Sequence, residues 1–267
     1  MKEILDLAIS IAHEVGALQR ERFTEPRAID TKSSTIDLVT DVDRASEEIA
    51  LERIARARPG DAILAEETGD HAGRSEWLWI IDPLDGTTNY AHGFPHFAVS
   101  IGVERRGIRE LGVIFDPLKN ELFTARRGAG AHLNGQPIQV SRIDRLDAAL
   151  LATGFGYDVH RSRDDNLNHF SAFVKCAQGV RRAGAAALDL AYVACGRFDG
   201  FWELHLHPWD VAAGLLLVEE AGGTSSDLDG GPVPRAGDRC VASNGRLHPD
   251  LLRVLAASSE AAASPSG

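Results

Sequence analysis

Two acidic residues stand three positions apart in the sequence Asp82-Pro83-Leu84-Asp85, directly after the apolar residues 79–81. An apolar strand would deliver Asp82, and Pro83 would turn the chain so that Asp85 comes back beside it. Two carboxylates this close raise each other's pKa unless a cation neutralises them. Because these donors are hard oxygens without His or Cys, they favour Mg²⁺ over zinc. The segment predicts a magnesium site; the alternative at this point is an ordinary turn with solvated acids.

The residues that follow could bind an anion. Gly86 lets the backbone approach another group closely, and the hydroxyls of Thr87 and Thr88 come next. If these residues open a helix, its unpaired N–H groups and positive dipole end would form a phosphate cradle. The sequence therefore predicts a metal site and a phosphate site that adjoin.

Further acids stand next to predicted elements elsewhere in the chain. Glu66 and Glu67 come directly after a predicted strand over residues 62–65, at the strand end where ligands commonly bind. Asp210 stands in the first turn of an apolar helix, and Asp43 stands at the start of another. Each of these two aspartates has a purely structural alternative as a helix-capping acid.

Hydrophobic periodicity indicates the elements that must position these side chains. Helical spacing is found over residues 4–23, 44–58, 166–177, 185–195, 208–221 and 249–257. Short apolar runs typical of strands cover residues 62–65, 78–81, 198–203 and 240–242, and alternating stretches between residues 97 and 140 predict an antiparallel meander. We expect an α+β half over residues 1–147, which carries most metal ligands and the phosphate loop, an α/β half over residues 148–258, which carries Asp210 and Glu203, and a disordered tail over residues 259–267.

The composition limits the classes of partner. The 267 residues include 28 Lys and Arg against 39 Asp and Glu, a formal net charge of −11. A net negative surface repels phosphate backbones and anionic membranes, so we expect no nucleic-acid or membrane partner, although a metal ion could mediate contact with a small phosphorylated molecule. Three cysteines without paired spacing, no apolar leader and no run of about 18 apolar residues predict a cytoplasmic protein with reduced thiols.

Other motifs leave more than one interpretation. Residues 154–157 begin like a dinucleotide fingerprint but lack its third glycine, which favours a loop near a substrate mouth. His205 and His207 could reach the rim of an active site or serve as packing and surface residues. The pair Arg181-Arg182 could face a substrate, a dimer partner or solvent.

Taken together, these residues resemble the inositol monophosphatase family of Mg²⁺-dependent, lithium-sensitive phosphatases. The resemblance covers residues 3–257, and the segments that carry it are 37–43, 66–68, 79–89, 209–214 and 219–223. It implies α+β and α/β halves packed as a layered αβαβα sandwich of the inositol monophosphatase and fructose-1,6-bisphosphatase type. Ala65 departs from the pattern, since the family often has glycine there, but this position supplies no ligand.

Carried over residue by residue, the resemblance assigns roles within one site. The implied metal ligands are Glu66, Asp82, the carbonyl of Leu84, Asp85 and Asp210. Thr87, held by Asp43, would orient the attacking water, and Glu66 would help to deprotonate it. The implied substrate contacts are Asp85, Gly86, Thr87, Gly184, Ala185, Ala186 and Glu203. Lys32 matches a position near a further, weaker metal site.

The resemblance also implies the reaction. We expect Mg²⁺-dependent hydrolysis of a small phosphorylated polyol or amino alcohol, most closely myo-inositol monophosphate, by in-line attack of an activated water. Two or three Mg²⁺ ions, Mn²⁺ as a substitute, Li⁺ as an inhibitor and a homodimer are implied as well. Histidinol phosphate and fructose 1,6-bisphosphate are the alternative substrates. A regulatory binding protein that keeps the fold without catalysis is the alternative from another class.

Overall fold

The computed structural model describes residues 1–25, 29–31, 38–235 and 237–263. Its helices are α1 (Lys2–Arg22), α2 (Asp41–Ala57), α3 (Thr87–Ala91), α4 (Leu167–Cys176), α5 (Ala186–Ala194), α6 (Pro208–Glu220) and α7 (His248–Ala263), with one 3₁₀ turn at Leu146–Ala148. Within these ranges no helix is long and apolar enough to cross a bilayer.

An eight-stranded sheet forms the first large layer. Its strands are β3 (Ala62–Ala65), β4 (Gly69–His71), β5 (Trp77–Asp85), β6 (Ala98–Arg105), β7 (Ile108–Asp116), β8 (Glu121–Arg126), β9 (Ala131–Leu133) and β10 (Gln136–Pro137). Their order is β10-β9-β8-β7-β6-β5-β3-β4, and β3 pairs with β5 in parallel while β5 to β10 form an antiparallel series. The meander predicted between residues 97 and 140 is confirmed.

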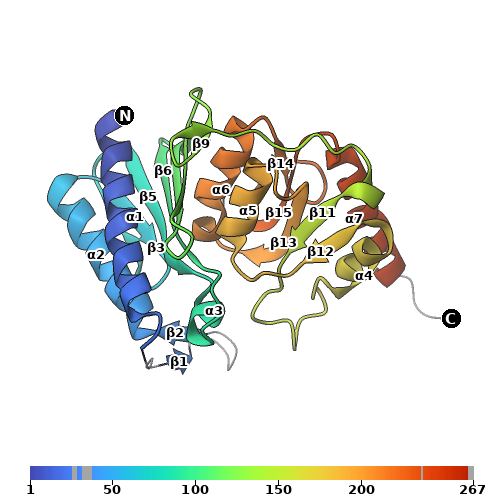
Figure 1. The fold of residues 1–267 in the computed structure, drawn as a ribbon, viewed down its shortest axis with the longest axis horizontal. Coiled ribbons are helices and arrows are strands. Elements are labelled where there is room, and N and C mark those ends of the chain that lie inside the picture. Colours follow the sequence, from blue (N-terminus) through green and yellow to red (C-terminus); the bar gives the residue numbers. More distant parts are fainter. Residues whose placement is uncertain (26–28, 32–37, 236, 264–267) are drawn as a thin grey trace.

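Helices α1 and α2 cover the outer face of this sheet (Figure 1). Their apolar stripes bury Ile11, Val15 and Ile54 against Trp79 and Val113 of the sheet. This packing follows from sequence, because each helix carries its apolar residues on one face and the central strands carry them on both faces. A small antiparallel pair, β1 (Ile29–Thr31) and β2 (Leu38–Thr40), leads into α2.

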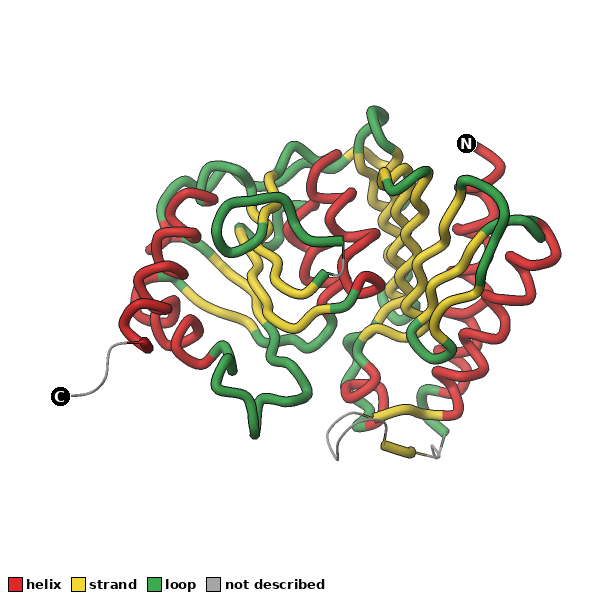
Figure 2. Tube along the Cα trace, turned by 180° about the vertical axis from the view of Figure 1, so that it is seen from behind, coloured by secondary structure: helices red, strands yellow, loops and turns green. Residues whose placement is uncertain are grey.

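A five-stranded mixed sheet forms the second large layer. Its strands are β11 (Leu150–Thr153), β12 (Gly179–Arg181), β13 (Gly200–Leu206), β14 (Thr224–Ser226) and β15 (Asp238–Ser243), in the order β12-β11-β13-β15-β14. Helices α4 and α7 lie on its outer side, and α5 and α6 lie between the two sheets (Figures 1 and 2). Every residue of α5 is buried, as a central helix with apolar residues all round requires. The predicted layered αβαβα sandwich is confirmed.

Three details differ from the expectations. Strand β5 continues through Pro83 to Asp85 with a register shift, where a turn was expected. Helix α7 continues to Ala263, so the first part of the predicted tail over residues 259–267 is helical, and residues 264–267 lie outside the described ranges. The short strands β1, β2, β4, β11, β12 and β14 were not predicted, since runs of three or four residues give little periodic signal.

Two glycines allow α6 to lie directly on the eight-stranded sheet. A Cβ on Gly102 would come 2.7 Å from the Cβ of Ala212, and one on Gly112 would come 2.6 Å from the carbonyl oxygen of Ala213. Both distances are shorter than any ordinary contact. The first turns of α6, which carry Asp210, are therefore set against β6 and β7 by the absence of two side chains.

We expect Gly112→Ala to lower the free energy of unfolding by about 1–3 kcal/mol, because the backbone oxygen of Ala213 cannot yield as a side chain could. Gly60→Ala is the matched control, since a Cβ there would meet only the Cβ of Ser75 at 3.9 Å. Urea unfolding of both variants measures the difference. Equal stability of Gly112→Ala and the parent chain would contradict this account of the helix–sheet contact.

Candidate active site

A bulge in β5 places two carboxylates on one side of the sheet. Asp82 pairs with Ser100 and Asp85 pairs with Ala98, so β5 gains one residue over β6 between the two aspartates. Residues three apart in a regular strand would point to opposite faces, and the extra residue brings them to the same one. The amide of Leu84 donates to Oδ1 of Asp82 at 2.9 Å, which fixes the bulge.

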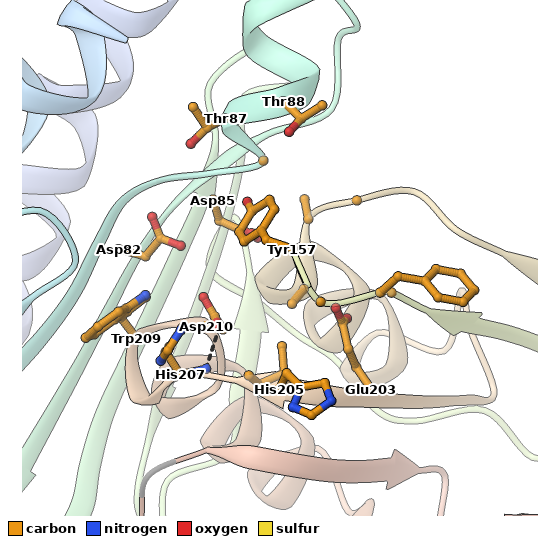
Figure 3. A pocket seen from close by; sticks show the side chains of 18 of the residues that line it. Asp82, Asp85, Thr87, Thr88, Tyr157, Glu203, His205, His207, Trp209 and Asp210 are labelled. Carbon is orange, nitrogen blue, oxygen red and sulfur yellow. Dashed lines mark hydrogen bonds between the residues drawn. The ribbon is translucent and has the colours of Figure 1, made fainter. Parts of the chain in front are cut away.

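Four acids from three segments line one open cavity. Asp82 and Asp85 come from β5, Glu66 follows β3, and Asp210 lies in the first turn of α6. Figure 3 shows the three aspartates reaching the same space from β5 and α6. The amide of Glu66 donates to the carbonyl of Ile81 at 3.2 Å, which extends the parallel pairing up to the acid.

The environment opposes the charged forms of these acids. Burial raises the pKa of Asp82 well above its ordinary value, and repulsion from Glu66, Asp85 and Asp210 adds to the effect. Burial, followed by the charge of Asp210, raises the pKa of Asp85 to about 8, although the amide of Ala187 donates to its Oδ2 at 2.8 Å. The cluster therefore needs a proton or a cation.

The donors fit a hard divalent cation. All four side chains offer carboxylate oxygens, the ligands that Mg²⁺ prefers, and the backbone carbonyl of Leu84 lies in the same cavity. Among the residues with described positions, no three His, Cys, Asp or Glu side chains already stand close enough to hold one ion. Binding therefore requires the carboxylates to turn toward a common point, against the repulsion that a cation would remove.

A buried hydroxyl–carboxylate pair adjoins the acids. The hydroxyl of Thr87 lies 2.7 Å from Oδ1 of Asp43 and 3.1 Å from the carbonyl oxygen of Leu84. Oδ2 of Asp43 accepts from the amide and hydroxyl of Thr40, the N-cap of α2. Asp43 thus caps α2 from its third helical position and also holds Thr87. It is therefore both a helix-capping acid and a residue of the site.

The backbone at Gly86 requires glycine. Its φ of +95° lies in the left-handed region, and a Cβ there would come 3.0 Å from the carbonyl oxygen of His96. The N–H groups of Thr87 and Thr88 open α3 and have no acceptor within the helix. The side-chain amide of Asn89 donates to the carbonyls of His96 and Ala183 at 2.8 and 2.9 Å, which ties this loop to the other half.

Four residues expected to contact substrate also line this cavity: Gly184, Ala185, Ala186 and Glu203. The carboxyl group of Glu203 packs directly against the backbone of Gly154, where any Cβ would collide with it. Burial, then the charge of Asp210, raises the pKa of Glu203 to about 8. The loop predicted at residues 154–157 also lines this cavity. Lys32 lies outside the described residues.

Sequence reasoning missed several residues that shape the site. The buried carboxylate of Glu47 accepts from the amides of Glu67 and Thr68 at 2.8 and 2.9 Å and so fixes the turn after Glu66. Its spacing of four residues from Asp43 on one helix face was the available signal. Asn89 carried no distinguishing pattern of its own. Of the pair Arg181-Arg182, whose place the sequence left open, Arg182 lines the cavity.

Both histidines left open by the sequence belong to the cavity wall. His205 adopts a φ of 61°, and its Nε2 lies 2.8 Å from the carbonyl oxygen of Asp164. The ring of His207 stacks on that of Trp209 with centroids 4.9 Å apart, and the amide of His207 donates to Oδ2 of Asp210 at 2.6 Å. These contacts fix the first turn of α6 beside the acids.

In the presence of a metal chelator, we expect the free energy of unfolding to fall as the pH rises from about 4 to about 8. The folded chain keeps a proton on Asp85 in this window, whereas the unfolded chain releases it near the ordinary value of 3.8, so folding binds protons. Asp85→Asn removes this titration and should reduce the slope, to which Asp82 and Glu203 also contribute, while Asp70→Asn, at an exposed position outside the cavity, should not. Urea unfolding at several pH values measures the slopes. Equal slopes for the parent chain and Asp85→Asn would show that Asp85 is ionised in the folded, metal-free state.

Comparison with known proteins gives relatives over almost the whole chain. An inositol-1-monophosphatase of Synechocystis is 45% identical over 255 residues, which are 95% of this chain and 88% of that protein. The Nus factor SuhB of Escherichia coli K12 is 44% identical over 255 residues, 94% of this chain and 95% of that one. The solved inositol monophosphatase of Anabaena superposes with a TM-score of 0.87 at 44% identity and covers 96% of both chains.

A family model described as the inositol monophosphatase family matches residues 1–261, so the match includes the bulge of β5, the start of α3 and the first turn of α6. The fold, the whole-length relatives and the family match agree. This chain belongs to the inositol monophosphatase family.

Proposed function

We propose that this protein is a Mg²⁺-dependent phosphatase of small phosphate monoesters, with myo-inositol monophosphate as its preferred substrate. The observation that carries the proposal is one cavity that holds the acid cluster, the Thr87–Asp43 pair and, on the opposite wall, Glu203. Membership in the inositol monophosphatase family supports the same reaction class.

The ions would be held by Glu66, Asp82, the carbonyl of Leu84, Asp85 and Asp210. Mg²⁺ bound there would supply positive charge to the phosphate and the leaving oxygen and would make a bound water more acidic. The chain's own contribution is a set of anchored carboxylates: one oxygen each of Asp82, Asp85 and Asp210 already accepts a backbone N–H. Two such ions are proposed, with Lys32 near a third.

Thr87 and Asp43 would position the attacking water. The Asp43 carboxylate can only accept, so the Thr87 hydrogen is directed to it at 2.7 Å. The lone pairs of the Thr87 oxygen then remain to accept a hydrogen bond from a water molecule. Glu66, on the same cavity wall, would take the proton that this water loses.

The attacking water and the leaving alcohol would lie on opposite sides of the phosphorus atom, as in-line attack requires. Backbone N–H groups of Gly86 and Thr87, at the start of α3, would donate to the phosphate oxygens. Glu203, with Gly184, Ala185 and Ala186, would contact the hydroxyls of the alcohol. A histidinol ammonium group or a sugar could also meet Glu203, so histidinol phosphate and fructose 1,6-bisphosphate are the alternative substrates.

Three finer properties are inferred from the family alone: Mn²⁺ replaces Mg²⁺, Li⁺ inhibits, and the chain forms a homodimer. Metal replacement and lithium titration in the phosphatase assay test the first two, and light scattering tests the third.

A second candidate function is that of an interaction protein, since one relative at 44% identity is named a Nus factor. The full set of acids and the Thr87–Asp43 pair favours catalysis, because a binding protein would have no need to bury these carboxylates together. A folded but inactive variant separates the two functions in a pull-down.

We expect the purified chain with Mg²⁺ to release phosphate from myo-inositol 1-phosphate with a higher kcat/KM than from histidinol phosphate, fructose 1,6-bisphosphate or 3′-phosphoadenosine nucleotides. Asp82→Asn and Asp210→Asn should each lower kcat by about a hundredfold or more, because charge at the metal is lost while the capping oxygen is kept. Circular dichroism controls for folding. Near-parent turnover in either variant would overturn the metal assignment.

Thr87 provides a matched pair of variants. Thr87→Val keeps the shape and removes the hydroxyl, so the water loses its acceptor and kcat should fall by about a hundredfold. Thr87→Ser keeps the hydroxyl near Asp43 and should retain most of kcat. Steady-state phosphate release measures both, and a Thr87→Val protein as active as Thr87→Ser would remove Thr87 from the mechanism.

A further inference from the structure

Three ionisable side chains lie at or near the wall of the cavity that holds Glu203. Arg182 and Glu203 line the cavity itself, and Asp189 lies behind its wall on α5. Within the described part of the chain, no ion pair of 4.0 Å or less joins Arg182 to Glu203 or Asp189, and no hydrogen bond between these side chains is formed. A donor and an acceptor thus face the same space without contacting each other.

The guanidinium group of Arg182, an exposed residue, lies beside Gly184 at the cavity. A Cβ on Gly184 would lie 3.1 Å from Nη1 of Arg182, so the absence of a side chain at Gly184 leaves room for the guanidinium group. The carbonyl oxygen of Gly184 accepts from the side chain of Asn89 at 3.2 Å, which holds the backbone next to Arg182.

The acceptor side is equally well placed. Glu203 packs against Gly154, where no Cβ could fit, and its carboxylate borders the cavity (Figure 3). Asp189 is only 1% exposed, and its Oδ1 is buried without a hydrogen-bond partner among the described residues. Burial raises the pKa of both acids, and the positive charge of Arg182 offsets part of that increase, which agrees with a guanidinium group near them.

The donor and acceptor groups indicate which ligand chemistry suits this space. Arg182 can only donate hydrogen bonds, whereas the carboxyl group of Glu203 can accept them. A hydroxyl group both donates and accepts, and two hydroxyls can bond to Glu203 and to Arg182 at once. The arrangement therefore suits a leaving alcohol that carries hydroxyl groups.

We propose that Arg182 is a specificity-determining residue that donates hydrogen bonds to hydroxyl groups of the leaving alcohol while Glu203 accepts from them. The proposal rests on the phosphatase function proposed above. Arg182 would then favour alcohols that carry hydroxyls on the carbons beside the ester carbon, and it would take no part in the hydrolysis step itself.

Two esters with the same carbon skeleton test this assignment. Glycerol 2-phosphate carries hydroxyls on both carbons beside the ester carbon, and isopropyl phosphate carries none. In Arg182→Met, which keeps length and removes the donors, the ratio of their kcat/KM values should shift about tenfold toward isopropyl phosphate, mainly through KM for glycerol 2-phosphate. Arg182→Lys should recover part of the ratio. Arg181→Met is the matched control, since the neighbouring Arg181 bonds the carbonyl of Val180 and lies outside the cavity, and it should leave the ratio unchanged.

Each outcome decides between the alternatives. An unchanged ratio of the two kcat/KM values in Arg182→Met would overturn the proposal. If kcat/KM falls equally on both esters, the ratio is unchanged and Arg182 acts on the phosphate or on folding. Glycerate 2-phosphate replaces one hydroxymethyl group by a carboxylate; a larger loss on it than on glycerol 2-phosphate would also overturn the proposal, in favour of anion recognition. If the parent chain hydrolyses none of these esters, the proposed phosphatase function fails instead.

Discussion

Repulsion among buried carboxylates is the constraint on which the rest of this structure depends. Asp82 and Asp85 are buried next to Glu66 and Asp210, and an isolated charge in such a place destabilises a folded chain by several kcal/mol. The fold keeps these groups together by giving three of them a backbone donor. The pairs are Leu84 with Asp82, Ala187 with Asp85, and His207 with Asp210. A cation that neutralises the cluster would therefore stabilise the native state as well as serve chemistry.

One of these anchors joins the two halves of the molecule. Asp85 belongs to β5 of the eight-stranded sheet, while its donor Ala187 lies in α5, in the layer between the sheets. Asn89 makes a second link, because its side chain bonds the carbonyl of Ala183 across the same boundary. The cavity is therefore complete only where the two halves meet, and the close approach of α6 over Gly112 belongs to the same packing.

Two of the acids show that capping and function need not exclude each other. Asp43 uses one oxygen to cap α2 and the other to hold Thr87. Asp210 caps α6 through His207 and lines the cavity in the same position. An acid in the third position of a helix is oriented by its cap, so the cap itself supplies the rigidity that a positioned carboxylate requires.

Local sequence patterns were enough to predict most of the element types, the family and the residues of the acid cluster. Its apolar periodicities are long enough to define α1, α2, α5, α6 and the meander, and the spacing of Asp82, Asp85 and Gly86 is specific. It also left Asp43 and Asp210 as either caps or site residues, because a local pattern contains no information on what lies across the cavity.

How these elements meet depends on contacts between residues far apart in the chain. The bulge that turns Asp82 and Asp85 to one face depends on the partner strand β6, and Pro83 alone gave a different expectation. Glu47, Asn89 and Arg182 gained their places through residues up to 95 positions away in the chain, as in the bond from Asn89 to Gly184. Contacts of that kind are set by the docking of two sheets through a buried helical layer, and no local spacing in the sequence encodes them.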